Sequence, residues 1–143
     1  NDVAKIRKQW GGKLIVKGIL DVEDALAAVN AGADAIVVSN HGGRQLDGAV
    51  SSIAALPPIV DAVNDRAEVW MDSGIRSGQD VLRAIALGAQ GTMIGRAFLY
   101  GLGAKGQAGV RQALDIIYKE LDLTLGLCGQ SDLSKVDSSI LIK

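Results

Sequence analysis

Two segments of the chain repeat the same pattern of helix, glycine and strand. Residues 24–40 (DALAAVNAGADAIVVSN) align without a gap with residues 80–96 (DVLRAIALGAQGTMIGR), at an offset of 56 positions. In each copy apolar residues recur at three- and four-residue spacing, which is typical of an amphipathic helix, and a short apolar run follows the glycine. Such units must cover their apolar strands with helices, so the repeat predicts an α/β fold with parallel strands.

Capping residues set the expected boundaries of these helices. In the first copy Asp21 is the expected N-cap, and Gly32 suits the left-handed residue that follows the last turn. In the second copy Ser77 begins a sequence of the capping-box type, and Gly88 ends the helix. The apolar runs predict four strands, over residues 14–17, 35–40, 68–72 and 92–95.

Pro57 and Pro58 complicate the connection between the second and third predicted strands. Because proline inside a helix loses a hydrogen bond and clashes with the preceding turn, we predict a short turn over residues 52–56 and a helix over residues 58–64. Further along, the spacing of apolar residues predicts a long amphipathic helix over residues 107–126. The polar tail from Gln130 is expected to pack as a C-terminal extension.

Four strand–helix units make half of a (β/α)8 TIM barrel, a fold of about 250 residues. An open four-stranded sheet would leave two unpaired edges, and no predicted strand is followed by the glycine-rich turn of a dinucleotide-binding, doubly wound sheet. We therefore expect residues 1–143 to be half of a single barrel domain. The chain is 48% apolar and 22% charged, the balance of a globular protein.

Composition excludes several partners. A net charge of −1 provides no basic surface for nucleic acid or an anionic membrane. Cys128 is the only cysteine, so no internal disulfide can form, and a reducing, cytoplasmic location is expected. The apolar runs fall far short of the roughly 20 residues that a membrane-spanning helix needs. The chain starts at Asn1 without an initiator Met or a leader, from which we expect an internal cut.

Polar residues gather where each predicted strand ends. The carboxyl ends of barrel strands share one face, and that face carries the active sites of barrel enzymes. His41, the only histidine, follows an apolar strand, and Gly42-Gly43-Arg44 adds close backbone approach and a fixed cation. An isolated histidine is more often structural, and Lys17 could be a surface lysine, but their position at strand ends favours a site.

The last two predicted strands each end in glycine and arginine, as Gly74 with Arg76 and Gly95 with Arg96. Barrel enzymes often bind phosphate with the loops after their seventh and eighth strands, where backbone N–H groups and a helix N-terminus meet the anion. Either arginine alone could be a solvated surface residue. Two in matching positions of adjacent units indicate a phosphate site.

The segment Ser39-Asn40-His41-Gly42-Gly43-Arg44-Gln45 resembles the active-site signature of the FMN-dependent 2-hydroxy acid dehydrogenases and oxidases, the family of glycolate oxidase, lactate oxidase and mandelate dehydrogenase. The resemblance covers essentially the whole chain, through Lys17-Gly18, Asp72 to Gly78, Ala86 to Ala89 and Ile94-Gly95-Arg96. It implies an FMN-binding (β/α)8 barrel, of which residues 1–143 would be the C-terminal half, strands 5–8. The barrel would oxidise an (S)-2-hydroxy acid to the 2-oxo acid, and no metal is implied.

The resemblance also implies a role for each matching residue. His41 would be the catalytic base and contact the substrate, and Arg44 would pair with the substrate carboxylate; both proton-first and hydride mechanisms are compatible with this pair. The residues implied to bind FMN are Lys17 beside the flavin N1 and C2 carbonyl, Ser39 at the ring, Asp72 at the ribityl hydroxyls, and Gly74, Arg76, Gly95 and Arg96 at the phosphate.

Other parts of the family's site come from the half of the barrel that this chain does not supply: an aspartate that orients the base, tyrosines and a second arginine. Asp47 lies in the loop and is not assigned that orienting role. We expect the N-terminal half as a second chain, separated at an exposed loop or as an isolated half, within a homo-oligomer, a tetramer. The electron acceptor could be oxygen, a quinone or a cytochrome, and a membrane-binding insert could lie in the other half. The alternatives are another FMN- or phosphate-binding barrel enzyme and a non-catalytic phosphate-binding half-barrel.

Overall fold

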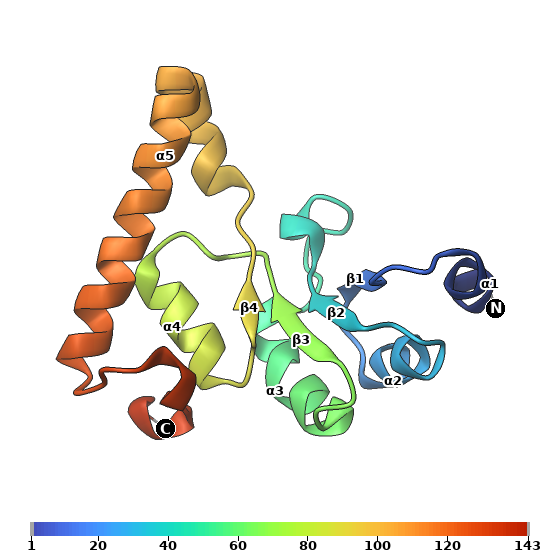
Figure 1. The fold of residues 1–143 in the computed structure, drawn as a ribbon. Coiled ribbons are helices and arrows are strands. Elements are labelled where there is room, and N and C mark those ends of the chain that lie inside the picture. Colours follow the sequence, from blue (N-terminus) through green and yellow to red (C-terminus); the bar gives the residue numbers. More distant parts are fainter. Residues whose placement is uncertain (1, 143) are drawn as a thin grey trace.

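The computed structural model describes residues 2–142; Asn1, the expected site of the internal cut, and Lys143 lie outside the described residues. Four parallel strands form one sheet in the order β1-β2-β3-β4 (Figure 1). The strands are β1 (Ile15–Ile19), β2 (Ala35–Val38), β3 (Glu68–Met71) and β4 (Gly91–Thr92). The α-helices are α1 (Asp2–Gln9), α2 (Val22–Asn30), α3 (Ser52–Val63), α4 (Gly78–Ala86) and α5 (Arg96–Leu127), and the 3-10 helices are η1 (His41–Gly43), η2 (Leu133–Lys135) and η3 (Ser138–Ile140).

The predicted α/β order is confirmed, because each strand pairs in parallel with the next one along the chain. Helices α2, α3 and α4 pack on one face of the sheet, and Ile36, Val38, Val69 and Met71 join them in the hydrophobic core. Val37 and Trp70 alternate with these residues and therefore face the other side. The edges of β1 and β4 have no partner strand among residues 2–142.

The predicted helix caps are confirmed. The Asp21 side chain accepts hydrogen bonds from the backbone of α2, and Gly32 follows the helix with φ +96°. Ser77 and Asp80 form a complete capping box at α4, and Gly88 follows that helix with φ +97°. The strand bounds differ by up to three residues: β1 extends to Ile19, whereas β2, β3 and β4 end earlier than predicted. β2 ends at Val38 because the chain turns into η1.

The predicted turn over residues 52–56 is wrong, because α3 is one continuous helix that contains Pro57 and Pro58. The two prolines leave the carbonyls one turn earlier without their helical donors. Burial outweighs this loss, since Leu56, Ile59 and Val63 are all completely buried. Each such side chain contributes about 1.5–3 kcal/mol, which is comparable to the penalty of about 3 kcal/mol for an interior proline.

The predicted helix over residues 107–126 is part of the longer α5, which begins at Arg96. A kink at Lys105 and Gly106 divides α5 into two arms. The arms meet where Gly101 and Gly109 face each other, since a Cβ on either one would overlap the other's backbone. The C-terminal tail packs through η3 against α4, as expected. Within residues 2–142 no helix is long and apolar enough to cross a membrane.

Helix α1 was not predicted, and none of its residues is buried. Arg7 ties it to the rest of the fold by an ion pair with Asp34 at 2.9 Å and by hydrogen bonds to the carbonyls of Trp10 and Gly12. Lys13 contacts the other carboxylate oxygen of Asp34 at 2.9 Å. The hydrogen bonds from Lys13 and from the Leu14 backbone lower the pKa of Asp34 to about 2.

Candidate active site

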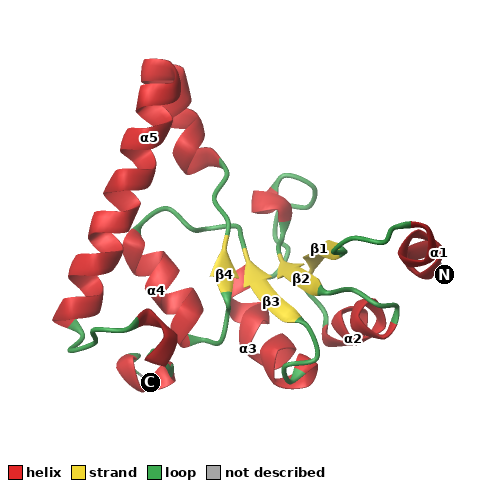
Figure 2. Ribbon diagram, in the orientation of Figure 1, coloured by secondary structure: helices red, strands yellow, loops and turns green. Residues whose placement is uncertain are grey.

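The strands β2, β3 and β4 are parallel, so the loops that follow them begin at neighbouring carboxyl ends and extend in the same direction (Figure 2). Together with Lys17 of β1, these loops line a cavity of about 320 Å³ that we call the active-site cavity. Its wall includes the predicted residues Lys17, His41, Arg44, Asp72, Gly74, Arg76, Gly95 and Arg96. Eight of the nine predicted site residues thus share one space. An adjoining cavity of about 460 Å³ shares Gly42, Ser73, Gly74, Ile75, Arg76 and Arg96 with it.

Lys17, in the middle of β1, forms an ion pair with Asp72, which directly follows β3; Nζ and Oδ2 are 2.6 Å apart. Lys17 also donates to Ser39 Oγ at 3.0 Å. Burial favours the neutral form of Asp72, but the hydrogen bonds from Lys17 and the neighbouring Ser39 and Ser73 outweigh it and lower the pKa of this carboxyl. Asp72 is therefore a carboxylate that holds the Lys17 ammonium beside the end of β3.

His41 opens η1 with a left-handed backbone, φ 55°, which is uncommon for a residue other than glycine. Its N–H donates to Ser39 Oγ at 3.1 Å. Its imidazole lies against Gly18, where a Cβ would stand 2.8 Å from His41 Nε2. Gly18, at φ +98°, lies where the β1–β2 register shifts, between Lys17 and Ile19. Such irregularities often lie beside active sites, and this one makes room for the imidazole.

Ser39 is the one predicted residue that does not line the active-site cavity. It is completely buried, and its hydroxyl accepts hydrogen bonds from Lys17 Nζ and the His41 N–H. Ser39 therefore supports two residues of the cavity wall, and its contact with a flavin ring stays a prediction. Arg44, by contrast, is exposed just after η1 and faces the cavity.

The helix termini at the cavity differ in how their N–H groups are satisfied. At α4, Asp80 accepts from the backbone N–H groups of Arg76 and Ser77, and Glu120 accepts from Gly78 at 2.9 Å. At α5 the N-cap is Gly95, which provides no side-chain cap. The first turn of α5 is thus the helix end whose donors remain available to an anion.

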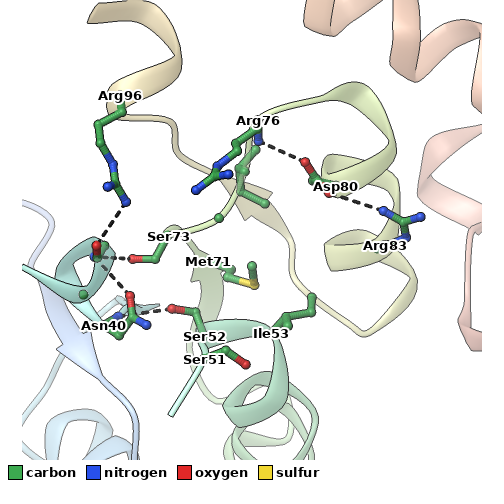
Figure 3. A pocket seen from close by; sticks show the side chains of 14 residues that line it. Asn40, Ser51, Ser52, Ile53, Met71, Ser73, Arg76, Asp80, Arg83 and Arg96 are labelled. Carbon is green, nitrogen blue, oxygen red and sulfur yellow. Dashed lines mark hydrogen bonds and ion pairs between the residues drawn. The ribbon is translucent and has the colours of Figure 1, made fainter. Parts of the chain in front are cut away.

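Arg76 lies in the loop before α4, and Arg96 is the first residue of α5; both extend toward the active-site cavity (Figure 3). Arg96 donates to the Gly42 carbonyl at 3.0 Å, which links α5 to η1. Within residues 2–142 neither guanidinium forms an ion pair with a carboxylate, so both positive charges face the cavity uncompensated. This arrangement of charges and free N–H groups suits a phosphate.

A family model described as FMN-dependent dehydrogenase matches residues 1–143. The chain belongs to the FMN-dependent dehydrogenase family. It is 57% identical, over 142 residues, to an L-lactate dehydrogenase of Caulobacter sp. (strain K31), and 54% identical to one of Pseudomonas syringae pv. syringae (strain B728a). Each match covers 99% of this chain and 37% of the relative, so the chain spans a little over a third of the length of these curated relatives.

Solved structures of the FMN-dependent dehydrogenase family have the same arrangement of elements. A mandelate oxidase with (S)-4-hydroxymandelic acid superposes with a TM-score of 0.88 at 51% identity, over 92% of this chain and 37% of that protein. A mandelate oxidase mutant with a monooxide FMN adduct superposes with a TM-score of 0.88 at 51% identity, over 92% and 42%. The four-stranded sheet with its helices is therefore a part of the TIM barrel of these neighbours, as the repeat predicted.

Two residues of this family member's site were missed by the sequence argument. Gly18 was noted only beside Lys17, because its contact with His41 depends on the register shift in β1. Ser73 was noted only within the Asp72 to Gly78 segment. It has a left-handed backbone, φ 69°, and its hydroxyl contacts three other residues of the site. The Ser-Gly pair directly after a predicted strand was the available signal for a tight turn.

Proposed function

We propose that this chain supplies the flavin- and carboxylate-binding half of an enzyme that oxidises an (S)-2-hydroxy acid to the 2-oxo acid with FMN. The observation that carries the proposal is the shared active-site cavity, in which Lys17, His41 and Arg44 line the same space as Arg76 and Arg96. A proton acceptor, a cation for a carboxylate and a pair of arginines for a phosphate are the groups that this reaction needs.

The residues around the cavity fit FMN. A Cβ added at Gly74 or Gly95 would meet no atom within 4 Å, so at both positions a ligand can approach the backbone closely. The N-terminus of α5, without a side-chain cap, suits a phosphate together with Arg76 and Arg96. The two adjoining cavities, about 320 and 460 Å³, are each within the range of about 300–1,000 Å³ for small-molecule sites.

Bound FMN would supply the acceptor for the two electrons that leave the substrate. Arg44 holds the substrate carboxylate through the two parallel hydrogen bonds that a guanidinium can form. His41 accepts a proton as the carbinol carbon becomes a ketone. Lys17, kept in place by the Asp72 carboxylate at 2.6 Å, stabilises negative charge that develops next to it.

A complementary segment is proposed to supply the other four strands of the barrel. Among residues 2–142 the edges of β1 and β4 have no partner strand, and an open sheet with such edges is prone to non-native pairing. Trp70 is also partly exposed on the face of the sheet that α2, α3 and α4 do not cover. The segment would also add residues that orient His41 and shape the pocket for the substrate side chain. The proposed assembly is a homotetramer that passes electrons to oxygen, a quinone or a cytochrome.

The test combines this chain with the remaining part of the Caulobacter sp. (strain K31) L-lactate dehydrogenase, which supplies the complementary strands. The complex should keep a yellow colour through gel filtration, and lactate or mandelate should bleach it when oxygen is excluded. A colourless complex of the two parts would exclude FMN binding. A yellow complex that no 2-hydroxy acid bleaches would instead indicate a different FMN-dependent barrel enzyme. Readmitting oxygen, and then adding quinone or cytochrome, identifies the acceptor.

A further inference from the structure

Ser73 has an uncommon backbone conformation. At φ 69° it lies in the left-handed region, where a residue with a side chain is strained unless its surroundings compensate. The next residue, Gly74, has φ +95° and is suited to that region. The contacts that can compensate for this strain are those of the Ser73 hydroxyl.

The Ser73 hydroxyl lies at the centre of a hydrogen-bonded group. It donates to Asp72 Oδ1 at 2.9 Å and accepts from the Gly42 N–H at 3.0 Å. It also lies 3.4 Å from the Ser39 hydroxyl oxygen. The Gly42 N–H is shared with Asn40 Oδ1, also at 3.0 Å, so Ser73 is one of its two acceptors.

Counting donors and acceptors gives these bonds a direction. The Ser39 oxygen accepts from Lys17 Nζ and from the His41 N–H, which uses both of its lone pairs. Its own proton is then left for the Asp72 carboxylate, whose pKa it lowers, or for the Ser73 oxygen at 3.4 Å. Ser73 accepts from the Gly42 N–H and gives its single proton to Asp72. Every hydroxyl in the group is satisfied, and the bonds all point toward the Asp72 carboxylate.

This geometry anchors two consecutive backbone amides. The His41 N–H is held by the serine that follows β2, and the Gly42 N–H by the serine that follows β3. Both serines connect to the Lys17–Asp72 ion pair. The backbone that carries the imidazole is therefore fixed to two strands and to a charged pair, although His41 itself is exposed.

We propose that Ser73 is a positioning residue that orders the His41 imidazole by tying the His41–Gly42 backbone to the Asp72 carboxylate. Its effect on the reaction rests on the proposed function, in which His41 accepts the proton. Its effect on the order of the imidazole does not, and can be measured without substrate. Arg44 does not hydrogen-bond to Ser73, so the affinity for the substrate should not depend on Ser73.

His41 is the only histidine of the chain, so labelling this chain alone with ¹³C-histidine gives a single imidazole signal to follow in the complex with the complementary segment. In S73G and S73A this signal should shift, and broaden or split, because the imidazole samples several positions. Substrate-driven bleaching should slow about 10- to 100-fold, the order expected for a misplaced catalytic group, with the substrate Kd unchanged.

The two variants separate the hydroxyl from the backbone. S73G removes the hydroxyl and relieves the strain of the left-handed backbone. S73A also removes the hydroxyl, but its backbone stays strained. If S73G matches the original protein and only S73A differs, strain is the cause and the proposal is wrong. Asp65, also left-handed at φ 59° but in the turn before β3, provides the control D65G, which should leave the signal and the rate unchanged.

The outcomes also distinguish this inference from the proposed function. A changed imidazole signal in both variants, in a complex that no 2-hydroxy acid bleaches, would support the positioning role and contradict the proposed reaction. A signal identical to that of the original protein in S73G, with bleaching intact, would contradict the positioning role and leave the reaction supported.

Discussion

At the scale of single residues, the site depends on close contact between an imidazole and a glycine. G18A places a methyl group 2.8 Å from His41 Nε2, at a residue with φ +98°. We expect a loss of stability of about 1 kcal/mol or more from the strained backbone, and a slower reduction of FMN because the imidazole must move. Urea unfolding and stopped-flow absorbance measure the two effects.

G129A is the matched control for this change. Gly129 has φ +72°, and a Cβ there would meet no atom within 4 Å. It should show a similar loss of stability with an unchanged rate of FMN reduction. Equal rates in both variants would mean that the contact between Gly18 and His41 has no influence on the reaction.

Replacing the imidazole itself tests the role of His41. H41A should slow FMN reduction by about 10²–10⁴-fold, the usual contribution of a positioned general base. Substrate binding should change far less, because Arg44 remains. Anaerobic single-turnover absorbance with a range of 2-hydroxy acid concentrations gives the limiting rate and the Kd separately. A limiting rate equal to that of the original protein would remove His41 from the mechanism.

Arg44 is predicted to act on binding. R44M should weaken the binding of a 2-hydroxy acid by about 1.5–3 kcal/mol, the range for a hydrogen bond to a charged group. R44K should recover only part of this loss, since an ammonium cannot form the two parallel bonds of a guanidinium. The matching uncharged amide serves as the control ligand. If the amide loses as much affinity as the acid, Arg44 does not bind the carboxylate.

At the same scale, the sequence identified residues by chemistry but not by conformation. Lys17, His41 and Arg44 could be predicted because a charged or titratable residue at the end of an apolar strand is unusual. Gly18 and Ser73 could not, because their importance follows from a register shift and from a left-handed backbone angle. Both features are set by contacts between strands, which a single sequence does not display.

At the scale of elements, the capping residues were the most reliable signal. Ser77 and Asp80 interact within one turn of helix, so local sequence determines that helix end. The helix over Pro57 and Pro58 was mispredicted because it depends on the burial of Leu56, Ile59 and Val63 against the sheet. Where tertiary packing outweighs a local penalty, a sequence rule about proline fails.

The helix ends also determine where a phosphate can bind. The N-terminus of α4 is occupied by Asp80 and Glu120, whereas α5 starts without a side-chain cap beside Arg96. R96M and R76M should therefore each raise the Kd for FMN about tenfold or more, from the loss of a charge-assisted hydrogen bond. Riboflavin, which lacks the phosphate, should bind both variants as it binds the original complex. Quenching of flavin fluorescence measures both ligands, and equal losses for the two would contradict a phosphate site here.

At the scale of the whole molecule, the internal repeat predicted the architecture. Two helix–strand units that align without a gap are compatible with few folds other than a parallel sheet covered by helices. The repeat could not predict helix α1, which lies N-terminal to both copies. Helix α1 buries no residue and has little apolar character, so no periodic pattern marks it. Its attachment depends on Arg7 and Asp34, which are 27 positions apart in the sequence.

This attachment should depend on pH in a defined direction. The pKa of Asp34 is lowered to about 2 from a usual value of 3.8, first by the hydrogen bond from Lys13. A lowered pKa means that the carboxylate stabilises the folded state fully above about pH 4, and that this contribution is lost as the pH falls toward 2. Helix α1 should then detach before the buried core unfolds, because its own residues add no burial.

Trp10 directly follows α1, and its indole N–H donates to the Lys13 carbonyl at 2.9 Å, so its fluorescence reports this detachment. In a W70F background Trp10 is the only tryptophan. Its emission should shift to longer wavelength between about pH 4 and 2, whereas D34N should show the shifted emission at neutral pH and little further change. An acid transition of the same size in D34N would mean that another carboxyl group controls it, and the tie between α1 and the barrel would have to rest on contacts other than the Asp34 charge.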